Sequence, residues 1–449
     1  MHLILGLMAC LDKPNIMDSG QADSNNREQI VLNTVAGWES QEWGYTTGGA
    51  FIDIDNDGDL DVAVAEGNDM SPGHIRVYEN NNGIIETQAN LVSETAHFHG
   101  HLSVGDVNGD GWTDVVVSRF LGDTGFDMPG GVSVYLNEFG TLSRTPTWVW
   151  DGAYSFSCAL GDMDNDGDLD MALAVGEAYY NEPDYSIVFE NNGHGDYTLV
   201  WQTETPRHSF DVAWVDINAD GYLDLAFANA QSPHAAYLSE QGVLPSFASW
   251  EAREGPFEGN TLDFEDVNQD GFPDLLISDN NQLGGLGTVR LFCGPDLELC
   301  WETTEDSQMW SAVTIQDVDD DGDFDLLAGA WWGAVEVFRN DEGFISTETV
   351  KSLGHDEMVV EALSWGAVSD FQSTLIQLEG SGLMRMPKGA YPISIQAGVV
   401  GDGYISGPSI RAQMRHSPAD LLLTDWTPDQ GNVIFFRKDQ SDMDSASSN

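Results

Sequence analysis

Short runs of apolar residues, interrupted by Gly, Asn and Asp, occur along most of the chain. Within many runs apolar residues alternate with small or polar ones, as in LDVAVAEG at 60–67. A period of two residues is typical of β-strands, and long helical heptads are absent from the sequence. The pattern therefore predicts an all-β chain.

The expected strands come in groups of four. In the first group, GGAFIDID at 48–55 and DVAVAEG at 61–67 flank a polar loop, and HIRVYENN at 74–81 supplies a third strand. A fourth strand, often with Trp, closes a group, as PTWVWDG at 146–152 does in the second. Four strands in about 50 residues are typical of one blade of a β-propeller.

The polar loop DIDNDGDLD begins at residue 53. Asp53, Asp55, Asp57 and Asp61 hold positions 1, 3, 5 and 9, and Gly58 holds position 6, as at the start of an EF-hand calcium loop. An EF-hand also needs Glu at position 12 and a helix afterwards, whereas here Val follows and then a strand. The loop pattern starts again at residues 106, 162, 216, 266 and 317, so it repeats every 50 to 56 residues.

Two further groups lack the loop. The seventh begins with VVEALSWGAV at 359–368, and the eighth contains ADLLLTDW at 419–426 and GNVIFFRK at 431–438. We expect an eight-bladed propeller over residues 29–438, closed by the N-terminal strand EQIVLNTV at 28–35. Seven blades is the alternative, if one loopless group is an irregular insertion.

Six D-x-[DN]-x-D-G-x-x-D loops at regular spacing make the sequence resemble the FG-GAP/VCBS repeat family, the calcium-loop propellers related to the integrin α-chain head. The resemblance covers roughly residues 29–438, although the literal FG and GAP signatures are poorly kept. It implies that the loops share one face of the disc and that the first strands begin on the opposite face.

The loops are expected to hold about six Ca²⁺ ions, with side-chain oxygens from positions 1, 3, 5 and 9 and a backbone carbonyl from position 7. Mg²⁺ fits less well because it requires a smaller octahedral site. We expect the ions to staple the first two strands of each blade, and presentation of a ligand is the alternative. The expected ligands are Asp53, Asp55, Asp57, Asp59, Asp61, Asp106, Asn108, Asp110, Trp112, Asp114, Asp162, Asp164, Asp166, Asp168, Asp170, Asp216, Asn218, Asp220, Tyr222, Asp224, Asp266, Asn268, Asp270, Phe272, Asp274, Asp317, Asp319, Asp321, Asp323 and Asp325.

The face opposite the loops is rich in aromatic and scattered polar residues, which suits a glycan or protein ligand. The expected ligand-binding residues are Trp43, Tyr45, His97, His99, Arg119, Tyr154, Arg207, His208, Trp310 and Trp331. His97, His99 and His101 alternate along one strand, so they could bind a transition metal or supply a general base. Alternatively, these rings fill the mouth of the channel.

The net charge of the sequence limits the classes of partner that it could bind. The formal charge of −59 makes nucleic acid and anionic membranes improbable partners. The apolar start ends in Leu-Met-Ala-Cys10, which resembles a lipoprotein signal over residues 1–10, and a polar tether follows at 11–28. We therefore expect export and a lipid anchor at Cys10, with a cell-surface, outer-membrane or periplasmic location.

Cys293 and Cys300 bracket a turn and could form a disulfide. Residues 439–449 are expected to be a disordered tail.

No Gly-x-Ser-x-Gly elbow, His-Glu-x-x-His or phosphate loop occurs in the sequence. The leading interpretation is a non-enzymatic, monomeric binding or adhesion propeller. A polysaccharide lyase or hydrolase with a converging His/Arg/Tyr site, and an envelope scaffold, are the alternatives.

Overall fold

The computed structural model describes residues 38–366, apart from 43, 256, 281–286, 304–307, 320 and 355–357. It also describes the strands at 374–378, 382–386, 420–425 and 433–436. Every regular element in these residues is a strand. No described segment is a helix that is long and apolar enough to cross a membrane.

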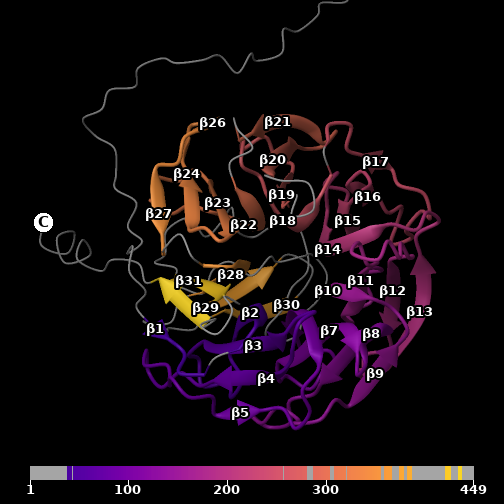
Figure 1. The fold of residues 1–449 in the computed structure, drawn as a ribbon, viewed down its shortest axis with the longest axis vertical. Coiled ribbons are helices and arrows are strands. Elements are labelled where there is room, and N and C mark those ends of the chain that lie inside the picture. Colours follow the sequence, from indigo (N-terminus) through magenta and orange to yellow (C-terminus); the bar gives the residue numbers. More distant parts are fainter. Residues whose placement is uncertain are drawn as a thin grey trace, which may run out of the picture.

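Six antiparallel sheets of four strands follow one another around a common centre (Figure 1). Each such sheet is one blade, as the grouping of the sequence predicts. The first three blades are β2 (Thr46–Ile52), β3 (Asp61–Gly67), β4 (Pro72–Tyr78) and β5 (Leu91–Val92); β6 (Phe98–Gly105), β7 (Asp114–Gly122), β8 (Gly125–Tyr135) and β9 (Trp148–Asp151); and β10 (Ser155–Gly161), β11 (Asp170–Val175), β12 (Ile187–Asn191) and β13 (Tyr197–Gln202).

The next three blades follow in the same order. They are β14 (His208–Val215), β15 (Asp224–Ala230), β16 (Ala235–Tyr237) and β17 (Trp250–Glu251); β18 (Gly259–Glu265), β19 (Asp274–Asp279), β20 (Thr288–Cys293) and β21 (Glu298–Glu302); and β22 (Met309–Gln316), β23 (Asp325–Trp331), β24 (Val335–Phe338) and β27 (Lys351–Leu353). In the last blade a small hairpin of β25 (Asn340–Asp341) and β26 (Phe344–Ile345) precedes β27.

The core lies between neighbouring blades. The second strand of each blade is covered on both faces, so all nine residues of β7 are buried. Val116 in β7 packs in one cluster with Leu173 in β11 of the next blade, and the other clusters likewise join adjacent blades. Burial on both faces explains why these strands are almost continuously apolar.

The expectation of eight blades is wrong. β28 (Val360–Gly366), from the predicted seventh group, pairs directly with β31 (Asp420–Asp425), from the predicted eighth. Residues 367–419 are therefore an insertion between two neighbouring strands. Within it, β29 (Thr374–Leu378) and β30 (Gly382–Met386) pair with each other and with no other described strand.

The two loopless groups thus share one composite sheet, which also contains a strand from the N-terminal part of the chain. Its order is β1-β32-β31-β28, where β32 is Val433–Phe436 and β1 is Trp38–Glu39. β28 lies beside the first blade, because Ser364 Oγ donates a 2.8 Å hydrogen bond to the carbonyl oxygen of Gly49. The strand expected at 28–35, the signal, the tether, Cys10 and the tail all lie outside the described residues.

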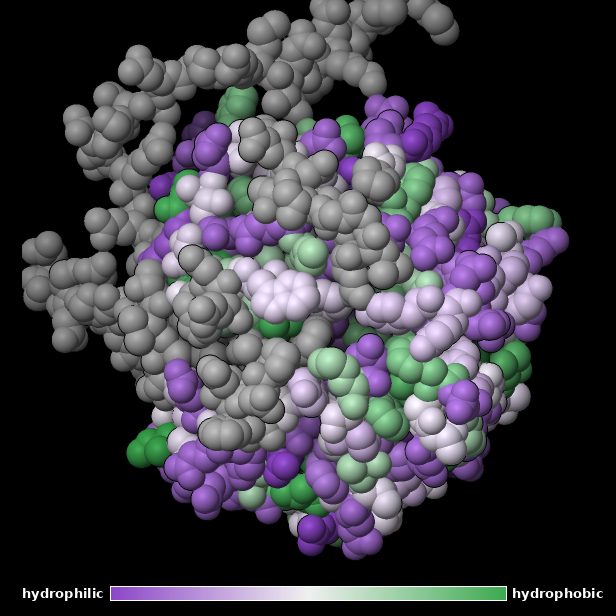
Figure 2. All heavy atoms as spheres, viewed as in Figure 1, coloured by the Kyte–Doolittle hydropathy of each residue, from purple (hydrophilic) through white to green (hydrophobic). Residues whose placement is uncertain are grey.

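On the face of the disc shown in Figure 2, hydrophilic residues (purple) are widely spread, and residues of intermediate hydropathy (white) and hydrophobic residues (green) lie between them. The dominance of polar residues agrees with the formal charge of −59.

Candidate functional site

All six loops connect the first and second strands of a blade, and each second strand begins at position 9 of its loop. The position 1 carboxylate accepts a hydrogen bond of 2.7–3.2 Å from the amide of the position 6 Gly in every loop. These glycines have φ between 87° and 100°, where a side chain would be strained. The position 7 amide donates to the position 5 carboxylate at 2.9–3.0 Å. The carboxylates at positions 1 and 5 are thus held in one orientation in all six loops.

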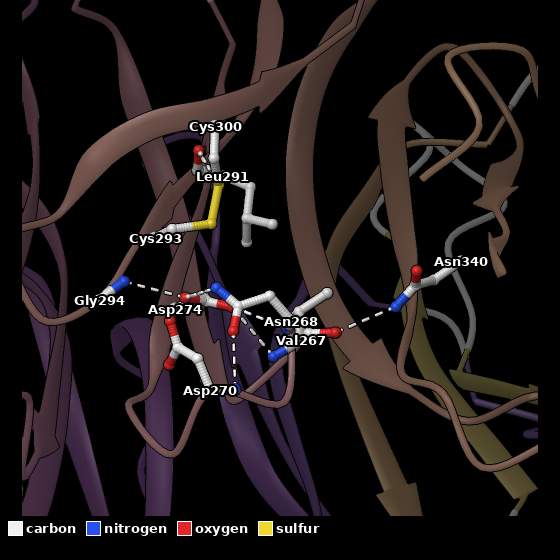
Figure 3. The surroundings of a disulfide bond; sticks show 9 residues. All are labelled: Val267, Asn268, Asp270, Asp274, Leu291, Cys293, Gly294, Cys300 and Asn340. Atoms are coloured by element: carbon white, nitrogen blue, oxygen red, sulfur yellow. Dashed lines mark hydrogen bonds between the residues drawn. A yellow bond between two sulfur atoms is a disulfide. The ribbon is translucent and has the colours of Figure 1, made fainter. Parts of the chain in front are cut away.

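The position 9 Asp is buried in every loop and accepts two backbone hydrogen bonds. In the fifth loop, Asp274 Oδ2 accepts from Val267 at 3.0 Å and Oδ1 accepts from Gly294 at 2.9 Å (Figure 3). The other five copies make the equivalent pair of bonds. This residue therefore fastens the start of the loop to the end of the third strand, a role that the spacing of the motif did not predict.

A buried Asn after the third strand joins neighbouring blades. Asn340 Nδ2 donates to the carbonyl oxygen of Val267, in the loop of the preceding blade, at 3.1 Å (Figure 3). Asn191 makes the equivalent bond to Val107 at 2.8 Å. The sequence signal for this contact is the Asn that ends YLN, FEN and FRN.

The six loops fall into two classes. The first, third and sixth have Asp at positions 3 and 7, whereas the second, fourth and fifth have Asn at position 3 and an aromatic residue at position 7. The position 7 side chain contacts the hairpin that follows the third strand. Asp59 Oδ2 accepts a 2.6 Å hydrogen bond from the amide of Asn82, and Trp112 packs edge-on against Phe139 at 6.2 Å between ring centroids. The position 7 side chain therefore has contacts of its own in these loops, besides the backbone carbonyl that is expected to bind an ion.

The donor sets of the loops fit a hard cation. Asp53, Asp55 and Asp57 offer oxygens within 4.8 Å of one another, and the third and sixth loops contain similar clusters. Asp53 Oδ1 is buried and has no hydrogen-bond partner. Burial raises the pKa of Asp53 to about 6 and that of Asp162 to about 7. Desolvated carboxylates at this spacing repel one another, and a divalent ion bound by oxygens would relieve that repulsion.

A pocket of about 460 Å³ lies at the opposite ends of the first two strands of the blades. Its walls come from the starts of first strands and the ends of second strands, so it opens on the face away from the loops. It is lined by Thr47, Asn68, Asp69, Met70, Phe120, Phe156, Ala178, Tyr179, Phe210, Ala230, Glu258, Gly259, Asn260, Asn280, Met309, Trp331, Trp332 and Glu361. A second cavity, of about 310 Å³, lies along the inner strands of all six blades and of β28.

Trp332 is the most unusual residue of the pocket. It is 57 % exposed and has a φ of 54°, in the left-handed region that bulky residues avoid. Its ring lies edge-on to Trp331, with 6.2 Å between centroids, and Trp331 Nε1 donates a 2.7 Å hydrogen bond to Glu361. Residues with such backbone strain cluster at functional sites, so Trp332 is a candidate ligand contact.

Of the predicted ligand-binding residues, Trp331 alone lines this pocket within the described part of the chain. Trp43 is not described. Tyr45 is half-buried, and Trp310 and His208 are buried in the first strands of their blades. Tyr154 donates a 2.8 Å hydrogen bond to the carbonyl oxygen of Phe126. Alternation along a strand did not reveal which side chains enter the pocket and which pack between blades.

The expected arginines are each held by a carboxylate of their own blade. Arg119 Nη2 lies 2.5 Å from Asp151 Oδ1, and Arg207 pairs with Glu251. Neither arginine lines either cavity.

The three alternating histidines do not converge on one point. His99 is fully buried and its Nδ1 lies 2.7 Å from the carbonyl oxygen of Glu66, while burial lowers its pKa to about 3. His97 lies 3.6 Å from Asp123, and His101 lies 3.6 Å from Asp211. The rings of His97 and His99 have centroids 5.8 Å apart. The three side chains thus have separate partners.

The acidic residues of the pocket were not among the predicted ligand-binding residues. Asp69 follows the second strand of the first blade, Glu258 precedes the first strand of the fifth, and Glu361 lies in β28. Burial raises the pKa of both Asp69 and Glu258. The available signal was their place next to strand ends on the face opposite the loops.

Cys293 and Cys300 are joined by a disulfide that links β20 to β21, with 5.8 Å between their Cα atoms (Figure 3). Cys158 is buried and unpaired.

Residues 53–117, which hold the first two loops, match the family model of the FG-GAP-like repeat. The chain carries an FG-GAP-like repeat. The fold and the repeat together indicate a module of the binding or adhesion type. Two similar solved chains come from crystal structures of BBS1N in complex with ARL6DN, soaked with lead and with mercury.

Each of the two solved chains is 10 % identical to this chain and covers 92 % of it, and 98 % of the solved chain is aligned. The TM-scores are 0.54 for the lead-soaked crystal and 0.55 for the mercury-soaked one, so the likeness is one of fold. No curated protein matches the sequence.

Proposed function

We propose that this protein is a calcium-stabilised binding propeller whose pocket opposite the loops receives a basic side chain of a protein ligand. The observation that carries the proposal is the lining of the pocket. It combines Trp331, Trp332 and Tyr179 with the carboxylates of Asp69 and Glu258, and among the described residues that line it none is Lys, Arg or His.

A cation suits this lining because of its carboxylates and its exposed aromatic ring. Burial raises the pKa of Asp69 and Glu258, and a positive charge nearby would favour their ionised forms. The exposed ring of Trp332 offers a face for a cation–π contact. The formal charge of −59 would also steer basic ligands towards the protein.

A protein ligand is favoured because the pocket continues into an exposed aromatic patch. Phe126 packs edge-on against Tyr180 at 5.0 Å and against Tyr179 at 6.1 Å, and Tyr180 is 67 % exposed. Tyr and Trp are the side chains enriched at the centres of protein interfaces. An acidic polysaccharide would meet three carboxylates in the pocket, which weighs against lyase or hydrolase activity on such a substrate.

Calcium is proposed as a structural ion. In each of the first five loops, the side chains at positions 1, 3 and 5 and the backbone carbonyl at position 7 would hold it, beside the position 9 carboxylate. The ion would supply charge neutralisation at the junction of the first two strands, so its binding free energy would add to the free energy of unfolding.

We further propose that the composite sheet is a seventh blade that closes the ring. β28 packs against both β2 of the first blade and β22 of the sixth, and β1 supplies its fourth strand. Closure by a strand from the other end of the propeller would complete the last four-stranded sheet and join the two ends of the ring. Anchoring through Cys10 at a cell surface belongs to the same proposal and rests on the sequence.

The ligand proposal can be tested by selecting peptides from a random displayed library on the wild-type protein. The selected peptides should contain Lys or Arg beside apolar residues, and Trp332→Ala and Glu258→Gln should each weaken their binding about tenfold or more. Phe139→Ser is the matched control, because Phe139 is 85 % exposed but lies beside the second metal loop.

Peptides without basic residues, or binding that survives both pocket variants, would contradict the proposal. A glycan array screened with the same four proteins covers the alternative. Glycan binding lost in Trp332→Ala would move the assignment to a sugar ligand.

A further inference from the structure

The sixth loop contains a side-chain cation. Arg339 Nη2 lies 2.9 Å from Asp319 Oδ2 and 3.0 Å from Asp321 Oδ2, and its Nε lies 2.9 Å from Asp341 Oδ1. The arginine side chain is 10 % exposed and that of Asp319 is fully buried. A guanidinium is therefore enclosed by three carboxylates at the end of the loop.

Two of these carboxylates belong to the metal-binding positions. Asp319 and Asp321 hold positions 3 and 5, which would supply side-chain oxygens to an ion in the other loops. A guanidinium stays protonated at all accessible pH values, so its charge remains beside the loop. An ion entering this loop would have to displace Arg339 from two ligands and would then lie next to a like charge.

The arrangement is specific to the sixth blade. Arg339 directly precedes the residue whose amide binds the position 9 Asp. The equivalent residues in the first five blades are Glu79, Leu136, Glu190, Leu238 and Cys293. None of them is basic, and no other cation among the described residues forms an ion pair with a loop carboxylate.

The sixth loop also differs from loops of the same class in the charge of the residue beside it. The sixth loop belongs to the acid-rich class, together with the first and third. In those two loops the equivalent residue is a Glu. Burial, together with the nearby charges of Asp55 and Asp57, raises the pKa of Glu79. The same position thus adds a negative charge to the first loop and a positive charge to the sixth.

We propose that Arg339 is the built-in cation of the sixth loop, so that this loop keeps its shape without a calcium ion and the propeller binds five ions tightly instead of six. This inference rests on the proposed binding of calcium by the other five loops. It differs from the expectation of six equivalent sites that the motif alone gives.

The test is to count calcium ions on the full chain by titration calorimetry and native mass spectrometry. The wild-type protein should show five tight sites, with any sixth at least tenfold weaker. Arg339→Leu, which installs the residue of the second and fourth blades, should gain one tight site. Glu79→Arg, which brings the arginine to the first loop, should lose one.

Six sites of equal affinity in the wild-type protein, with no gain in Arg339→Leu, would overturn the inference and leave the calcium proposal intact. Absence of calcium binding by the wild-type protein would overturn both. If Arg339→Leu failed to fold, the wild-type count and the Glu79→Arg count would still decide between five and six sites.

Discussion

The side-chain amide of Asn137 donates a 2.7 Å hydrogen bond to the carbonyl oxygen of Ile54, which lies in the metal loop of the preceding blade. The same nitrogen donates to the carbonyl oxygen of Thr113 in its own loop at 3.1 Å. One buried amide therefore holds two neighbouring loops together, and the cohesion of the disc depends in part on such residues.

Asn137→Ala should lower the free energy of unfolding by about 2 kcal/mol, because it removes two hydrogen bonds and leaves two buried carbonyl groups without a donor. Urea denaturation in saturating calcium would measure the change. The matched control is Ser239→Ala, since Ser239 holds the same position in the fourth blade and its buried hydroxyl has no hydrogen-bond partner. Equal losses in the two variants would contradict the assigned role of Asn137.

Position 4 of the loops offers a stabilising substitution. Asn56 and Ala219 both have a φ of 56°, which Asn tolerates and Ala does not. Asn56 also donates a 2.9 Å hydrogen bond to the carbonyl oxygen of Gly111 in the next loop. Ala219→Asn should therefore raise the free energy of unfolding by about 1 kcal/mol. Thermal unfolding would measure it, and Gly109→Ala, at a φ of 71°, should have the opposite effect.

Removal of calcium should make stability depend on pH. Burial raises the pKa of Asp61 and Asp170 to about 8 and that of Asp114 to about 7, above the usual value of about 3.8. Because the folded state then binds protons more tightly than the unfolded state, its stability is greatest at low pH and falls as pH rises from about 4 to 8.

In EDTA, the contribution of these carboxylates should thus make the protein less stable at pH 8 than at pH 5. Calcium should raise stability most at pH 8, because it binds the ionised carboxylates and releases their protons. Histidines such as His99 act in the opposite direction, but they contribute equally with and without calcium. The measurement is the difference in melting temperature between calcium and EDTA across this pH range. A difference that shrinks as pH rises would contradict the assignment.

The Trp332 side chain should lower the free energy of unfolding and at the same time be required for ligand binding. Trp332→Gly removes the strain of a bulky residue at a φ of 54° and should raise the free energy of unfolding by about 1 kcal/mol. It should at the same time abolish binding of the selected peptides. Thermal unfolding and peptide titration on one sample measure both effects. A loss of stability would show that the ring supports the fold instead of the ligand site.

The local sequence was sufficient to predict the strands of the six blades that have loops. Gly at position 6 and Asp at position 9 define where the first strand of each blade ends and where its second strand begins. It was not sufficient for the last sheet. VVEALSWG and ADLLLTDW pair across the insertion 367–419, and no local pattern shows that two distant strands are neighbours. The loopless groups were therefore counted as two blades.

The candidate ligand site was predicted less well for a similar physical reason. His99 and Trp331 both carry rings near strand ends, but His99 is buried against the carbonyl oxygen of Glu66 while Trp331 borders the pocket. The difference depends on how adjacent blades pack, and the period of a strand does not encode it. The same limit applies to Arg339, whose contacts come from two segments of one blade.

The composite sheet has a consequence for biosynthesis. β1 leaves the ribosome early, yet its partner β32 lies at Val433–Phe436. The six blades of consecutive strands can each form as the nascent chain emerges. Pairing of β1 with β32 cannot occur until nearly four hundred further residues have been translated. β1, the first strand that the structure describes, is therefore among the last to find its partner, and a stalled or truncated polypeptide would carry it unpaired.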